Sequence, residues 1–143
     1  MKKTICTMLL LVFILTLMTG CSFGGIPREV EQHYIGFLDA MKTDFAAAAK
    51  YCYHETPEQT EMMINSGDDY IVQYEILEWK QLNDSLWVVK SSYLQGAAKE
   101  SELIYQFVGY IDGKLYVMQN PRLVPEELKG DLDLEIYRFK EVA

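Results

Sequence analysis

Apolar residues recur at every third or fourth position between residues 28 and 52. They are Val30, Tyr34, Phe37, Leu38, Met41, Phe45, Ala48, Ala49 and Cys52. This spacing is the period of an α-helix that buries one side. Residues 46–49 are all alanine, which favours helix and lets another element approach closely. The pattern therefore predicts one long helix over residues 28–52.

A second, shorter helix is predicted after Thr56. Thr56 offers a capping hydroxyl, Pro57 fits the first helical position, and Gln59 stands where a capping box requires an amide or a carboxylate. Gly67 is a natural stop for this helix.

Beyond Gly67 the spacing changes to alternation, which is typical of β-strands. The runs 70–77, 86–89 and 103–108 are rich in aromatic and branched residues. Tight-turn pairs separate such runs at Asn83-Asp84 and at Asp112-Gly113. Neighbouring strands are therefore expected to form antiparallel hairpins in a meander.

The remaining turn and strand signals are less regular. Gly96-Ala97-Ala98 is the weakest turn signal, and Gly109 within a strand suggests a bulge or a sharp bend. One helical turn is predicted over residues 125–128. A last alternation of Leu132, Leu134 and Ile136 fits either an edge strand or a tail packed on the outside.

Helices followed by antiparallel strands predict an α+β fold, with the N-terminal helices packed on a curved antiparallel β-sheet. Residues 28–143 have the size of a single domain. No second domain is indicated.

The first twenty residues have the layout of a secretory signal. Lys2 and Lys3 precede an apolar run over 5–18, which is shorter than the roughly 20 residues that a spanning helix needs. Met18-Thr19-Gly20-Cys21 resembles the lipobox of bacterial lipoproteins, although leucine is commoner where Met18 stands. The resemblance implies that residues 1–20 are removed and that Cys21 is lipidated.

Two acyl chains on Cys21 would hold the chain stably on a membrane without spanning it. The resemblance thus implies a lipid-anchored protein of the cell membrane, on its extracytoplasmic face. Residues 21–27 form a tether that reaches roughly 20 Å at about 3.3 Å per residue. The domain is therefore expected to work close to the membrane surface.

Charge narrows the range of partners. The whole chain has a net charge of −8, and loss of the two signal lysines takes it to about −10. This balance argues against nucleic acid and against adsorption to anionic lipid. The lipid anchor is the expected membrane contact, and a protein partner is expected to be basic.

The cysteine count excludes a disulfide framework. Cys6 leaves with the signal and Cys21 carries lipid, so Cys52 has no mate within the chain. Cys52 could pair between chains, but its place on an apolar helical face favours burial.

The stretch from Val30 to Ala49 resembles the opening helices of nuclear transport factor 2-like, or SnoaL-like, cone domains. An amphipathic helix, a short polar break ending in aspartate and an aromatic, and an alanine-rich second helix follow one another in that family. The resemblance implies a break at Lys42-Thr43-Asp44 in place of one long helix, and a curved sheet that wraps a helix around an apolar cavity. We expect alternate strand positions and the buried helix face to line it: Tyr34, Phe37, Trp87, Val89, Tyr93, Tyr105 and Phe107. A packed aromatic core is the alternative.

Residues suited to catalysis are scattered. His33 lies beside the apolar helix face and His54 in the loop before the second helix. None of the following carboxylates has an obvious partner: Asp39, Asp44, Asp68 and Asp69. We therefore expect no catalytic residues, no cofactor and no enzymatic activity.

His54-Glu55 together with Glu58 and Glu61 comes nearest to a metal-binding spacing. Glutamates at a helix start are already favoured by the helix dipole. We therefore expect no metal site there.

These observations favour a non-catalytic binding or interaction module for a protein or an apolar small molecule. A homodimer through the sheet face is also expected, with Ile104, Val108 and Tyr110 pointing outward. Two alternatives stay open: an isomerase- or dehydratase-type enzyme with an acidic or histidine base in the cone cavity, and a subunit of an envelope assembly.

Overall fold

The computed structural model describes residues 25–65, 70–96 and 100–138. The predicted signal, Cys21, Gly67 and Ala97-Ala98 lie outside these residues. Along the chain the elements are α2 (Arg28–Ala40), α3 (Phe45–Ala49), α4 (Pro57–Asn65), β1 (Ile71–Asn83), β2 (Leu86–Gln95), β3 (Glu102–Ile111), β4 (Lys114–Met118), η2 (Pro121–Leu123), α5 (Glu126–Lys129) and η3 (Glu135–Tyr137). No helix among the described residues is long and apolar enough to cross a membrane.

The four strands form one antiparallel sheet in the order β1-β2-β3-β4, which confirms the meander. Asp112 and Gly113 both have positive φ, 50° and 75°, as a type I′ turn requires. The first hairpin turns at Asp84 and Ser85, one residue later than predicted, because Asn83 still pairs with Leu86.

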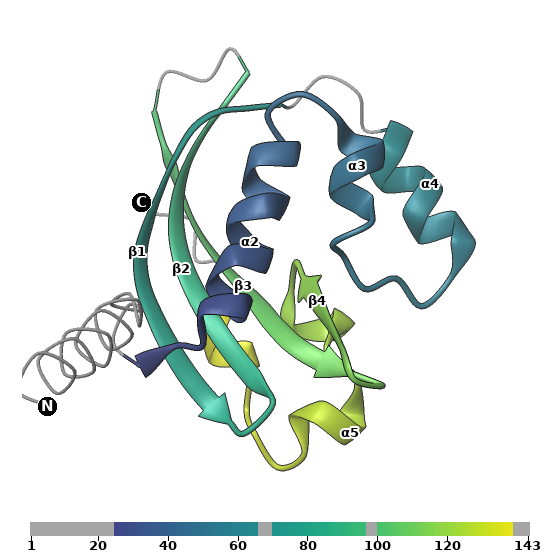
Figure 1. The fold of residues 1–143 in the computed structure, drawn as a ribbon, viewed down its shortest axis with the longest axis vertical. Helices are drawn as coiled ribbons and strands as arrows, with labels where there is room; N and C mark the ends of the chain where they lie inside the picture. Colours follow the sequence, from purple (N-terminus) through teal and green to yellow (C-terminus); the bar gives the residue numbers. More distant parts are fainter. Residues whose placement is uncertain (1–24, 66–69, 97–99, 139–143) are drawn as a thin grey trace, which may run out of the picture.

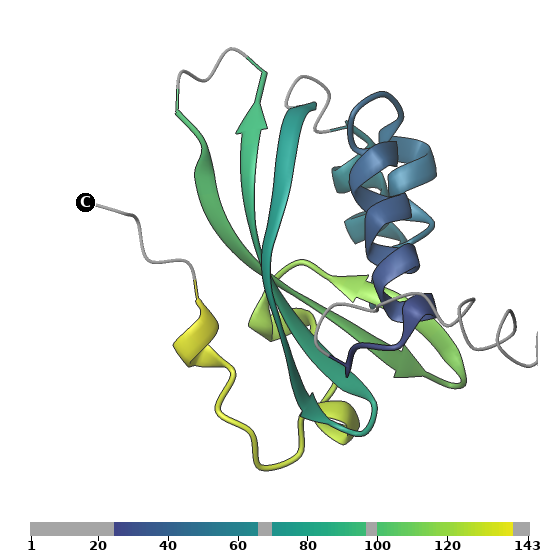
Figure 2. The same ribbon diagram turned by 60° about the vertical axis from the view of Figure 1, so that its left-hand side comes forward.

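The sheet curves around α2, which lies in its hollow (Figures 1 and 2). Much of this curvature arises in β1, because the pairing of β1 with β2 shifts register at three places. Each such bulge bends a strand and increases its twist. The α+β fold class is confirmed.

The single long helix predicted over residues 28–52 is wrong. α2 ends at Ala40, and α3 begins after Asp44, whose extended backbone and side chain cap the new helix. Asp44 Oδ1 accepts a hydrogen bond from Ala47 N at 3.0 Å. The break at residues 42–44 is the one that the family resemblance implies. The apolar period continues across it because both helices bury residues of the same interior.

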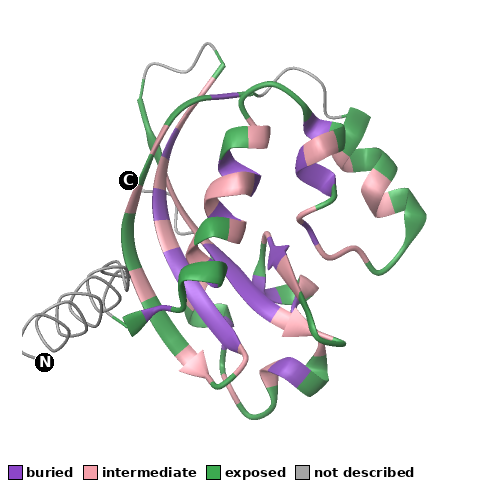
Figure 3. Cartoon of the chain, in the orientation of Figure 1, coloured by how far each residue is buried: buried purple, intermediate pink, exposed green. Residues whose placement is uncertain are grey.

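Buried residues form two clusters on opposite faces of the sheet. Figure 3 marks the buried positions along the helices and strands. The inner core fills the space between α2 and the concave face. It consists of Ile26, Val30, Tyr34, Phe37, Leu38, Ala48, Cys52, Ile71, Trp87, Val89, Tyr93, Val108 and Val117. The outer core, made of Leu86, Val88, Phe107, Met118, Val124, Leu128 and Leu134, lies between the convex face and the C-terminal segment, which crosses that face in Figure 2. Leu134 is buried in the outer core beside Leu128. Of the two alternatives for this segment, the packed tail is therefore the observed one.

Gly109 causes no bulge. It pairs with Leu86 on one side and with Tyr116 on the other, without a register shift in either ladder. A Cβ at this position would lie 2.8 Å from Leu128 Cδ2 and 2.9 Å from Ser85 O. Glycine is needed because a neighbouring loop and the α5 turn approach the strand closely.

Candidate functional site

The seven residues predicted to line a cavity do not share one side of the sheet. Five belong to the inner core, namely Tyr34, Phe37, Trp87, Val89 and Tyr93. Tyr105 and Phe107 face the opposite side, because they pair with Lys90 and Val88, which alternate with the inward positions of β2.

The three residues expected to face outward from β3 are likewise on the other side. Val108 is part of the inner core, and Ile104 and Tyr110 pack against it. The prediction for β3 therefore exchanged its inward and outward residues. Both faces of this strand are covered, so apolar residues occur at odd and at even positions, and the alternation does not indicate which set faces α2.

A buried polar cluster lies inside the inner core. Tyr34 donates to Gln106 Oε1 at 2.8 Å, and its hydroxyl lies 3.0 Å from both Ser91 Oγ and Tyr93 OH. Tyr93 also donates to Gln106 Oε1. Burial raises the pKa of Tyr34 and of Tyr93 well above the usual range. Both hydroxyls therefore stay protonated, and they tie α2 to β2 and β3.

An open groove lies beside α4, apart from the buried polar cluster. Its volume is about 420 Å³. It is lined by side chains from α3, α4, η2 and the end of β2, and from the segments that follow α2, α3 and β4: Met41, Phe45, Cys52, Tyr53, His54, Gln59, Met62, Met63, Gln95, Gln119 and Leu123. We call it the α4 groove.

Helix α4 forms the outer wall of the α4 groove, and a helix cap fixes its first turn. Thr56 Oγ1 accepts from Gln59 N at 3.4 Å, and Gln59 Oε1 accepts from Glu55 N at 2.8 Å. The predicted cap is thus present, although the amide of Gln59 reaches one residue further back than in a standard capping box. No residue of α4 is buried, and Met62 is 73% exposed.

The inner wall is held by β4. Cys52 forms an isolated parallel bridge with Val117, flanked by hydrogen bonds of 2.9 Å from Tyr53 N to Val117 O and 2.7 Å from Val117 N to Tyr51 O. The Cys52 thiol is free and buried, as predicted. Burial raises its pKa to about 12, against a smaller opposing effect of the hydrogen bond from Gln119. At neutral pH the thiol is protonated.

Both histidines are shifted toward the neutral form. Burial lowers the pKa of His33, whose Nε2 donates to Tyr51 O at 3.2 Å, and it lowers the pKa of His54 as well. A hydrogen bond to the Ala49 backbone partly offsets the shift at His54. His54 Nε2 is buried and has no hydrogen-bond partner within the described structure.

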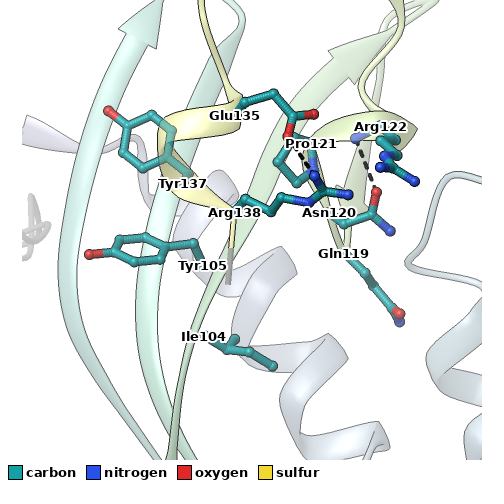
Figure 4. Close-up of a pocket in the computed structure, with 9 residues that line it drawn as sticks. All are labelled: Ile104, Tyr105, Gln119, Asn120, Pro121, Arg122, Glu135, Tyr137 and Arg138. Atoms are coloured by element: carbon teal, nitrogen blue, oxygen red, sulfur yellow. Dashed lines mark hydrogen bonds and ion pairs between the residues drawn. The ribbon is translucent and has the colours of Figure 1, made fainter. Parts of the chain in front are cut away.

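A second hollow of about 350 Å³ lies where the C-terminal segment meets the sheet (Figure 4). Arg138 pairs there with Glu135 at 3.4 Å, and Tyr105 and Tyr137 lie with ring centres 5.6 Å apart. Asn120 accepts from Arg122 N at 3.0 Å. The ion pair is exposed, so this hollow offers only weakly held polar groups.

Two of the four aspartates considered for catalysis lie among the described residues, and both have structural partners. Asp39 accepts from Tyr74 at 3.0 Å and pairs with Lys42 at 3.2 Å, while Asp44 caps α3. Asp68 and Asp69 lie outside the described residues. Within the described ranges, no three or more histidine, cysteine, aspartate and glutamate side chains are grouped to hold a metal ion. His54 and Glu55, Glu58 and Glu61 therefore form no such group.

The sequence reasoning missed the residues that give the α4 groove its character. Met41, Met63, Gln95 and Gln119 come from four different segments, so no local pattern joins them. The signal within reach was the pair Met62-Met63 on a helix with few other apolar residues.

Comparisons with known proteins add no relative. No protein-family model matches the chain, and no curated protein matches it. The functional argument therefore rests on the geometry.

Proposed function

We propose that this chain is a membrane-anchored, extracytoplasmic lipoprotein whose domain is a non-catalytic binding module, and that the α4 groove binds an apolar small molecule. The open groove itself is the observation that carries the proposal. The anchor rests on the lipobox resemblance at Cys21, and the intact mass of the membrane-purified chain, starting at a diacylated Cys21, checks it.

The chemistry of the groove supports an apolar ligand. Phe45, Met41 and Met63 form its apolar walls, and amides of Gln59, Gln95 and Gln119 are spaced around them. Small-molecule sites combine mainly apolar walls with a few polar groups that fix orientation. Methionine side chains adapt to ligands of different shape because they are unbranched and polarisable.

The arrangement of α4 also supports binding. This helix has no fully buried residue, and Met63 is its contact with the inner core, so α4 is held by few apolar contacts. A ligand in the groove would add apolar contacts to α4.

The enzyme alternative lacks a comparable observation. It requires an inward carboxylate or imidazole beside a tyrosine hydroxyl. Around Tyr34 the described partners are Ser91, Tyr93 and Gln106, which are neutral at physiological pH.

Methyl NMR of the full-length chain in detergent, labelled at the methionine methyl groups, tests the proposal with indole as the probe. We expect saturable shifts at Met41, Met62 and Met63 and none at Met118, which is buried in the outer core. Gln95→Trp fills the groove and is expected to weaken binding about tenfold or more, which corresponds to about 1.4 kcal/mol.

Gln81→Trp on exposed β1 is the matched control and is expected to bind indole as the wild type does. Equal shifts at Met118 and Met63, or unchanged binding in Gln95→Trp, would show that indole does not occupy the groove.

A further inference from the structure

Two sulfur atoms converge on one amide at the inner wall of the α4 groove. Gln119 Nε2 lies 3.8 Å from Cys52 Sγ and 3.7 Å from Met63 Sδ. The two sulfur atoms come from the bridge beside β4 and from α4, and Gln119 lies 67 and 56 residues away from them in the sequence. An N–H group gains little from a thioether acceptor, because sulfur is a weak hydrogen-bond acceptor.

His54 adds a nitrogen donor to the same groove. The ring hydrogen-bonds to the Ala49 backbone, and its Nε2 is buried with no hydrogen-bond partner among the described residues. A backbone carbonyl that accepts from the other ring nitrogen is the usual support of a metal-binding histidine.

The donor set selects the kind of metal. Thiolate and thioether ligands favour soft ions such as Cu(I), and imidazole binds copper as well. Structural zinc sites take four ligands from cysteine, histidine and carboxylates. Cys52 and His54 are the two such residues that line the groove, so a site here depends on methionine sulfur.

We propose that the inner wall of the α4 groove binds one Cu(I) ion through Cys52 Sγ, Met63 Sδ and His54 Nε2. The amide of Gln119 moves aside, and the sulfur atoms that now face it turn to the metal. The Cys52 thiol gives its proton to solvent as the copper–sulfur bond forms, and copper keeps its oxidation state. This site shares the groove with the proposed apolar ligand but does not rest on it.

Competition for Cu(I) tests the site. The full-length chain in detergent carries Cys6→Ser and Cys21→Ser, which leaves Cys52 as its only thiol. It is titrated without oxygen against Cu(I) held by bicinchoninate, whose colour fades as the protein takes the metal. We expect one ion per chain, with binding weakened about tenfold or more by Cys52→Ala, by Met63→Leu and by His54→Gln.

Met63→Leu keeps the volume and the apolar surface but removes the sulfur. A lower Cu(I) affinity in this variant is therefore expected to report the loss of the sulfur ligand and not a change in side-chain volume. Met118→Leu in the outer core is the matched control and should bind Cu(I) as the parent does. Far-ultraviolet circular dichroism confirms that each variant is folded. No uptake of Cu(I), or undiminished uptake by folded Met63→Leu or Cys52→Ala, overturns the proposal.

Discussion

α2 and α4 are both amphipathic helices, but they are held in different ways. Val30, Tyr34, Phe37 and Leu38 of α2 are fully buried, whereas α4 buries none of its residues (Figure 3). α2 lies in the hollow of the curved sheet, and α4 lies beyond α3, away from the sheet (Figure 1). Position relative to the sheet, more than helical pattern, decides how much each helix is buried.

This difference divides the domain into a rigid part and an adjustable part. Local opening costs least where few apolar contacts are buried. α2 is fixed by apolar packing and by the buried hydroxyl of Tyr34, while α4 depends on its cap and on Met63. The groove lies between the two parts, where one wall can move.

Truncation of one apolar side chain on each helix is expected to give the largest difference in the free energy of unfolding. Phe37→Ala leaves a cavity in the inner core and is expected to lower the free energy of unfolding by about 3–5 kcal/mol. Met62→Ala removes an exposed side chain and is expected to change it by less than about 0.5 kcal/mol. Urea denaturation followed by tryptophan fluorescence measures both. Similar losses in the two variants would mean that α4 is held as firmly as α2.

Removal of single hydroxyl groups sharpens the comparison. Tyr34→Phe leaves Ser91 and Gln106 with fewer partners in a closed interior, so we expect a loss of about 1–3 kcal/mol in the free energy of unfolding. Tyr110→Phe is the matched control, because the Tyr110 hydroxyl donates to Glu29 at 2.6 Å on the exposed side. There we expect less than about 1 kcal/mol. A smaller loss in Tyr34→Phe than in Tyr110→Phe would contradict a structural role for the buried cluster.

Acidification gives the smallest expected effect. Burial lowers the pKa of His33 below the ordinary histidine value of 6.5, so the unfolded chain binds the proton more readily than the folded one. The free energy of unfolding therefore falls as pH drops below 6.5 toward the folded pKa, and this contribution is constant above 6.5. His33→Gln is expected to flatten this part of the curve in urea midpoints measured from pH 7.5 to 5. An equally steep curve for His33→Gln would assign the pH dependence to other groups.

The elements themselves were predictable because their signals are local. The Thr56 cap, the Asp112-Gly113 turn and the helical turn before Gly130 all follow from backbone preferences of a few residues. The long helix was predicted wrongly because the apolar spacing continues through Asp44, although the cap at Asp44 interrupts the backbone. The predicted strands were too short, because backbone pairing extends beyond the apolar runs.

By itself the sequence determined the α+β class, the hairpin order and the burial of Cys52, because helical period, turn residues and apolar character act over short distances. Tertiary structure alone decided which face of β3 turns inward and where the open groove lies. Tyr105 and Phe107 are as apolar as the inward residues, and only the C-terminal segment packed on the convex face accounts for their burial there. Met63, Cys52 and Gln119 meet only because the tertiary fold brings α4, the segment after α3 and the segment after β4 together.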